Sequence, residues 1–108
     1  MTIMTVDELS ELECALIDAC DEWVGLGGMI VPLDLRTTHS GCCCPFGALV
    51  RQQAGANYPI AEDTARELGL RFWFVYAFMT EFDAPSPRRR SPAAAMARRF
   101  RERYLGAA

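Results

Sequence analysis

Residues 70–82 read LRFWFVYAFMTEF, and this stretch decides the fold class. Its apolar residues recur at helical spacing, at Phe72, Val75, Tyr76, Met79 and Phe82. The density of aromatic and β-branched residues also suits a strand. We predict a helix, because the stretch is long and its neighbours are helical. A helix that is apolar on nearly all sides is expected at the centre of the core or against a partner.

Start and stop signals predict four further helices, over residues 5–25, 44–55, 59–69 and 91–106. The first opens with a capping box, in which Thr5 is the N-cap and Glu8 reaches back to it. The second opens with Pro45, which makes Cys44 the predicted N-cap. We therefore predict an all-α fold, a compact bundle of four or five helices with a short extended ribbon near residues 29–35.

The chain has 108 residues, of which 51% are hydrophobic, and this suffices for one domain over residues 1–108. Residues 84–91 read APSPRRRS and predict an exposed Pro/Arg linker before the C-terminal helix. No run of about 18 apolar residues occurs, and no basic segment precedes an apolar one at the N-terminus. We expect a cytoplasmic protein without a membrane span, whose five cysteines are thiols or metal ligands.

Three consecutive cysteines lie in the stretch HSGCCCPFG, residues 39–47. The dipole of a helix start favours the thiolate of a cysteine, which binds zinc or attacks an electrophile. His39, Cys42 and Cys44 are the candidate zinc ligands. Structural zinc sites usually draw on two separated ligand pairs, and no second C-x-x-C is present. We favour one or two of these cysteines as small core residues and keep zinc binding as an alternative.

Enzyme activity is not predicted. A cysteine nucleophile needs a base and a group that orients the base. His39 is the single histidine of the chain, and no residue stands out as its orienting partner. The sequence therefore identifies no catalytic residue and requires no cofactor other than the alternative zinc ion.

Charge is divided between the two ends of the chain. Residues 1–34 hold eight acids and no base, whereas residues 84–108 hold seven arginines and one acid. The arginines could meet phosphates, but no nucleic-acid-binding signature accompanies them. We favour an arginine-rich helix that lies across the acidic first helix of its own fold, and nucleic-acid binding is a further alternative.

Five short motifs run through residues 20–104. They are Trp23 at a helix end, Leu33-Asp34-Leu35, Cys44-Pro45-Phe46-Gly47-Ala48-Leu49, Leu68-Gly69-Leu70 and Glu81-Phe82-Asp83. With a final helix that carries an aromatic residue and arginines, they resemble a group of small uncharacterised proteins from actinobacteria and their phages. The extra cysteines depart from that pattern, as does Glu81, where the group has glycine. The resemblance implies a phage or prophage accessory role and carries over no reaction.

The preferred function is a non-enzymatic interaction module that binds and modulates a host protein. Surplus aromatic and charged residues favour it, because aromatic residues and arginine dominate protein interfaces. An exposed Trp73 or Phe74 would strengthen this interpretation. The sequence leaves homo-oligomerisation open. The candidate contact residues are Glu11, Asp18, Glu22, Trp73, Phe74, Arg98, Arg99, Arg101 and Arg103.

Overall fold

The computed structural model describes residues 4–32, 42–54 and 61–106, and the structural statements below concern these residues. They form five helices and two short strands. In chain order these are α1 (Val6–Gly25), β1 (Met29–Ile30), β2 (Cys42–Cys43), α2 (Pro45–Ala54), α3 (Ala61–Leu68), α4 (Phe72–Asp83) and α5 (Pro92–Leu105). The all-α prediction is confirmed, and the ambiguous stretch is the helix α4. None of the described helices is long and apolar enough to cross a bilayer.

Two helix starts follow directly from local sequence. The Thr5 hydroxyl accepts the Glu8 N–H at 3.1 Å, and the Glu8 carboxylate accepts the Thr5 N–H at 2.8 Å, which completes the predicted capping box of α1. At α5, the Ser91 hydroxyl accepts the Ala94 N–H at 3.1 Å, and Pro92 occupies the first turn. Both predicted caps are therefore confirmed.

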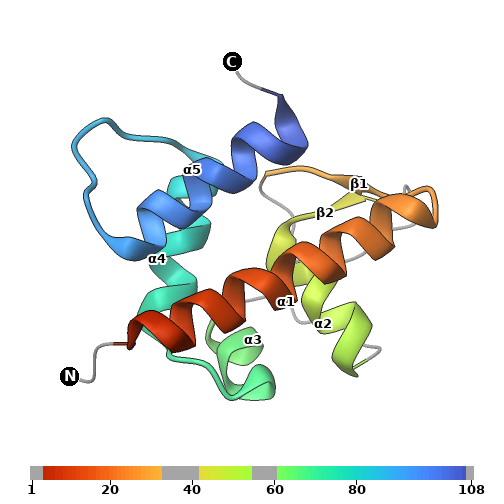
Figure 1. Ribbon diagram of the computed structural model, residues 1–108, viewed down its shortest axis with the longest axis horizontal. Helices are drawn as coiled ribbons and strands as arrows, with labels where there is room; N and C mark the ends of the chain where they lie inside the picture. The colour runs from red at the N-terminus through yellow and green to blue at the C-terminus, as the bar shows by residue number, and fades with distance from the viewer. Residues whose placement is uncertain (1–3, 33–41, 55–60, 107–108) are drawn as a thin grey trace.

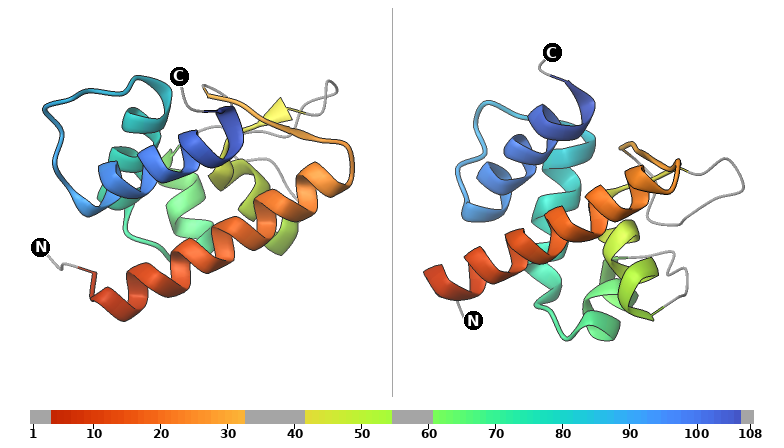
Figure 2. Two further views of the ribbon diagram at one scale, coloured as in Figure 1. Left: turned by 45° about the horizontal axis from the view of Figure 1, so that its top comes forward. Right: turned by 45° about the vertical axis from the view of Figure 1, so that its right-hand side comes forward.

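Helix α4 lies at the centre of the molecule, packed against α3 and α5, while α1 lies along α2 and β1 (Figures 1 and 2). The buried face of α4 carries Val75, Phe78, Met79 and Phe82. This face differs from the predicted stripe, because Tyr76 is half exposed and Phe72 only partly buried. The aromatic side chains of α4 therefore divide between the core and the surface.

The core is built around the ring of Phe78. Its centroid lies 5.0 Å from that of Phe46 on α2, 5.6 Å from that of Phe100 on α5 and 5.9 Å from that of Phe82 on α4. All four rings are fully buried or nearly so. Edge-to-face aromatic contacts add to the stabilisation that burial provides. Three helices thus meet at one aromatic cluster.

The predicted ribbon is only partly described. Met29 and Ile30 form β1, which pairs in parallel with the β2 residues Cys42 and Cys43. The Val31 N–H extends this pairing with a bond to the Cys43 carbonyl at 2.8 Å. Residues 33–35 lie outside the described residues. The partner strand was not predicted, because two residues are too few to give a periodic signal.

The turn after α1 is fixed by Trp23. Its indole N–H donates to the Met29 carbonyl at 3.2 Å, and the Arg51 guanidinium lies over the ring, 4.9 Å from its centroid. A Cβ atom built on Gly28 would lie only 2.1 Å from a carbon of the indole. The glycine is therefore required by the close approach of the tryptophan ring.

Residues 84–91 join α4 to α5 as an extended loop, and all of them except Ser86 are exposed. The loop is held by Glu81, a fully buried residue of α4. Its carboxylate accepts the Ser86 N–H at 3.0 Å, lies 2.8 Å from Arg98 Nη2 and lies 3.6 Å from Arg89 Nη1. Burial of a carboxylate requires such pairing. Glu81 therefore ties the loop and α5 to the core.

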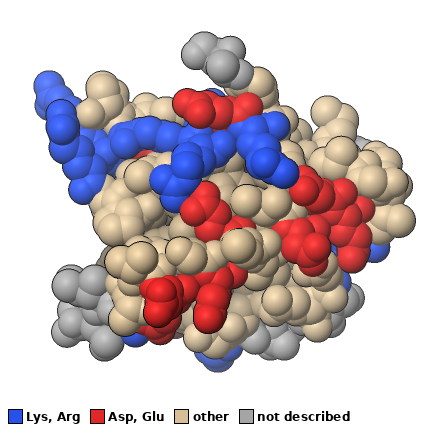
Figure 3. Space-filling model, in the orientation of Figure 1, with Lys and Arg blue, Asp and Glu red and all other residues tan. Residues whose placement is uncertain are grey.

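The arginine-rich helix α5 runs alongside α1 and pairs with its acidic face, as predicted from the charge distribution. Arg99 binds Glu13 with two contacts of 2.7 and 2.8 Å, and Arg103 Nη2 lies 3.2 Å from Asp21. Figure 3 shows the basic band of the loop and α5 beside the acidic side chains of α1. These exposed pairs contribute little stability individually, but they align the two helices.

Candidate interaction surface

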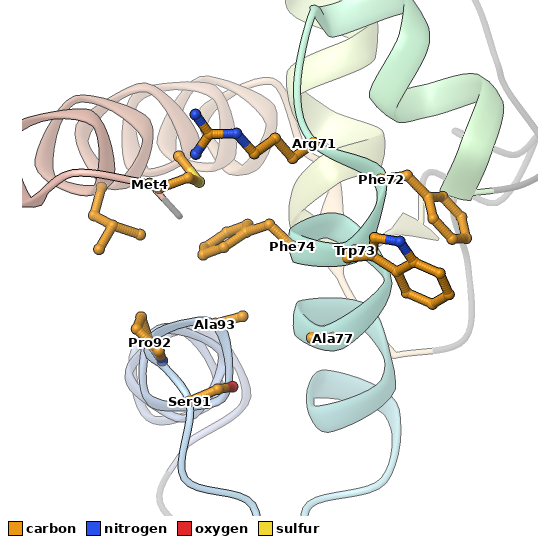
Figure 4. Close-up of a pocket in the computed structure, with 10 residues that line it drawn as sticks. Met4, Arg71, Phe72, Trp73, Phe74, Ala77, Ser91, Pro92 and Ala93 are labelled. Carbon is orange, nitrogen blue, oxygen red and sulfur yellow. The ribbon is translucent and has the colours of Figure 1, made fainter. Parts of the chain in front are cut away.

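A hollow of about 600 Å³ opens between the N-terminal ends of α1, α4 and α5 (Figure 4). We call it the groove. Most of its lining is apolar, with the exceptions of Arg71 and Ser91. The apolar lining comprises Met4, Leu9, Phe72, Trp73, Phe74, Ala77, Pro92 and Ala93. An apolar hollow with few polar groups is the usual character of a binding site.

The groove follows from how the helices begin. Met4 and Leu9 flank the capping box at staple spacing, and both remain partly buried at the groove wall. Phe74 projects from α4 into the space between α1 and α5, where Pro92 and Ala93 begin α5 (Figure 4). Three helix ends therefore meet around this space without closing it.

An exposed aromatic cluster borders the groove. Trp73 is 65% exposed and Tyr76 is 50% exposed, and their ring centroids lie 6.0 Å apart. The partly buried Phe72 ring lies 4.9 Å from that of Trp73. We call these three side chains the aromatic patch. Exposed tryptophan and tyrosine are enriched at binding hot spots, so this patch is the leading candidate contact surface.

Arg71 stands directly before α4 and carries the main charge at the groove. Its Nη2 lies 3.8 Å from the nearer Glu8 carboxylate oxygen, which is too far for a hydrogen bond. Its Nη1 is buried and has no hydrogen-bond partner among the described residues. Arg71 was not among the predicted contact residues. The one sign of it in the sequence is that Arg71 is the single basic residue of the apolar stretch 70–82.

The predicted arginine contacts are all engaged within the fold. Arg99 and Arg103 bind the acidic face of α1, and Arg98 binds Glu81. Arg101 donates to the Phe82 carbonyl. These internal contacts use part of the donor set of each guanidinium group, and the carboxylates of Glu13, Asp21 and Glu81 neutralise the charge of Arg99, Arg103 and Arg98.

Two of the three predicted acidic contacts are likewise engaged within the fold. Asp18 accepts a hydrogen bond from the Gln52 side chain at 2.9 Å, and Glu22 pairs with Arg51 at 3.1 Å. Glu11 is exposed at the edge of a smaller hollow between α1 and α2. Of the predicted contact residues, only Trp73 and Phe74 lie at the groove.

The cysteine cluster is part of the core. Cys43 and Cys44 are both fully buried, which confirms the preferred interpretation. The Cys44 sulfur accepts the Gly47 N–H at 3.3 Å, so Cys44 caps α2 as predicted. Burial raises the pKa of Cys44 and outweighs the opposing effect of the Gly47 N–H, so the thiol form is favoured in spite of its place at a helix start.

No three His, Cys, Asp or Glu side chains lie close enough to hold a metal ion in the described parts of the chain. His39 lies outside the described residues, and the side chain of Cys42 is likewise not described. The Cys44 sulfur lies 3.6 Å from the Met79 sulfur in the core. The three-ligand zinc site therefore stays a prediction, and its one described member is buried.

The cysteines are expected to differ sharply in alkylation. Cys14 is exposed on α1, whereas Cys20, Cys43 and Cys44 are buried, and burial raises the pKa of Cys20 as well as that of Cys44. A buried thiol reacts only after local opening. Brief treatment of the native protein with iodoacetamide at neutral pH should modify Cys14 and spare these three. Peptide mass mapping reads the result, and early modification of Cys44 would contradict its placement.

Comparisons with protein-family models, with curated proteins and with solved structures found no match. The fold and the groove therefore carry the functional argument.

Proposed function

We propose that the protein is a non-enzymatic interaction module that binds another protein through the groove and the aromatic patch. The observation that carries this proposal is the 65% exposure of Trp73 beside an apolar hollow of about 600 Å³. Leaving a large aromatic surface in water is unfavourable, and a partner that covers it gains that free energy. By contrast, the hollow of about 440 Å³ between the loop and the C-terminal half of α5 is smaller and has no aromatic ring in its lining.

The internal pairing of the α5 arginines favours a protein partner over a nucleic acid. Arg99 and Arg103 already have their charges neutralised by Glu13 and Asp21, which weakens their attraction for phosphate. Phosphate binding would also bring a polyanion beside the acidic face of α1, and the repulsion between these like charges opposes binding. Binding at the groove does not depend on these arginines.

The resemblance to actinobacterial and phage proteins points to a host protein as the partner that we propose. The setting would then be the host cytoplasm, where the thiols of Cys14, Cys20, Cys43 and Cys44 stay reduced. Modulation of that host protein follows if binding covers one of its working surfaces.

Trp73→Ala combined with Tyr76→Ala is expected to abolish capture of the partner from host lysate. Both side chains are at least half exposed, so their loss removes contact area while the core stays intact. Val24→Ala combined with Leu26→Ala is the matched control, because these exposed apolar residues lie at the C-terminal end of α1, away from the groove. Quantitative mass spectrometry compares the captured proteins. Equal recovery by both double variants, or no specific protein on the wild type, would count against the proposal.

A further inference from the structure

We propose that the groove binds a segment of the partner that presents an apolar side chain together with a carboxylate, and that Arg71 receives the carboxylate. This inference rests on the proposed function and specifies the chemistry of the partner. It predicts a preference for acidic, apolar peptide sequences that a purely apolar surface would not show.

The first argument is the state of Arg71 in the free protein. Its Nη1 is buried without a hydrogen-bond partner, which is costly for a charged donor. Its nearest carboxylate oxygen, on Glu8, lies 3.8 Å from Nη2, and the other Glu8 oxygen accepts the Thr5 N–H. The guanidinium fork therefore has unused donors. A carboxylate matches the geometry of such a fork with two parallel hydrogen bonds.

The second argument is the position of the guanidinium relative to the apolar lining. In Figure 4, Arg71 extends toward Met4 above the space that Phe74 enters, and Pro92 and Ala93 lie on the opposite side of that space. The Arg71 side chain is 36% exposed, so it has room to turn toward a ligand. An apolar side chain placed against Phe74 would bring a carboxylate on the same segment within reach of Arg71.

The surrounding charge supports an acidic segment. At the other end of the groove, Ser91 follows the exposed loop residues Arg88, Arg89 and Arg90. Arg89 pairs with Glu81, whereas Arg88 and Arg90 form no ion pair within the described residues. Asp7 and Glu8 in the first turn of α1 oppose Arg71, and Glu8 is tied into the helix cap. The loop end of the groove is therefore the basic end, which attracts an acidic ligand.

Selection from a random peptide library displayed on phage tests the inference with the intact protein as bait. We expect the enriched peptides to combine Asp or Glu with Leu, Phe, Met or Trp. A labelled peptide from this set should bind Arg71→Met about tenfold more weakly than it binds wild type, the size expected for one charge-assisted contact. Arg66→Met is the matched control, because Arg66 lies exposed on α3, away from the groove, and should leave affinity unchanged.

A change in the peptide tests whether its carboxylate is the group that contacts Arg71. Replacing the peptide carboxylate by its amide should weaken binding to wild type about tenfold and should not weaken binding to Arg71→Met further. Ala77→Trp fills the groove and should abolish binding. Should Ala77→Trp lose its helical circular dichroism, Trp73→Ala replaces it, and we expect it to weaken binding because it removes the exposed ring at the edge of the groove.

The outcomes separate the two proposals. Suppose that Ala77→Trp abolishes peptide binding, so that the peptides do occupy the groove. If those peptides show no acidic preference, or bind Arg71→Met as tightly as wild type, the role of Arg71 is overturned and binding at the groove stands. Enriched peptides that neither Ala77→Trp nor Trp73→Ala affects, or no enrichment at all, would overturn both. Sedimentation of a wild-type dimer that Ala77→Trp converts to monomer would identify a second copy as the occupant, and would overturn the proposed partner.

Discussion

Replacing Phe78 by alanine is expected to lower the free energy of unfolding by about 3–5 kcal/mol, the range typical of a fully buried phenylalanine. The Phe78 ring contacts Phe46, Phe82 and Phe100, so its removal leaves a cavity bounded by three helices. These rings cannot close the gap without moving α2 or α5. Urea unfolding followed by circular dichroism gives the free energy, and the slope of the transition should stay unchanged.

Trp73→Ala is the control for this substitution. The tryptophan lies on the same helix, but it is 65% exposed and contributes little to the core. We expect a loss below about 1 kcal/mol, as for most surface substitutions. Comparable losses for the two variants would contradict the division of α4 into a buried face and an exposed face.

Arg98→Met is expected to lower the free energy of unfolding by about 3 kcal/mol. This value is at the lower end of the range typical for removing one partner of a buried ion pair. The substitution leaves the fully buried Glu81 carboxylate with only Arg89, at 3.6 Å, and the Ser86 N–H. The Arg98 side chain is itself 37% exposed, which moderates the effect. Thermal unfolding followed by circular dichroism, together with urea titration, measures the change.

Arg99→Met is the matched control, because it makes the same change at the next position of α5. The Arg99 pair with Glu13 lies at the surface, so its loss should cost less than about 1 kcal/mol. Combining Arg98→Met with Glu81→Met should recover most of the stability, since no uncompensated charge then remains in the core. A double variant less stable than Arg98→Met alone would contradict the pairing.

The sequence predicted the features that depend on neighbouring residues. The capping residues Thr5 and Ser91, and the cap of α2 at Cys44, act within three or four positions along the chain, so their pattern is readable without the fold. The attraction between α1 and α5 was also readable, because the opposite charges are concentrated at the two ends of the chain. The same charge concentration also made the arginines candidate contacts, a role that their internal pairs now make less favourable.

The features that depend on tertiary contacts were not readable. Glu81 lies in a sequence of ordinary helical character, and its burial is set by Arg98 from another helix. The role of Arg71 at the groove depends on how the ends of α1 and α5 approach α4. The protonation of the Cys44 thiol was not readable for a related reason. The helix dipole is a local effect, whereas the burial that opposes it comes from the packed core.

The most direct test of groove binding is amide chemical-shift mapping of the ¹⁵N-labelled protein with the partner captured from lysate. The account predicts that the largest shifts fall on residues 71–77 and 91–93, which line or border the groove, with little change along the outer face of α5. Shifts centred on Arg99 and Arg103, with the groove residues unchanged, would contradict it.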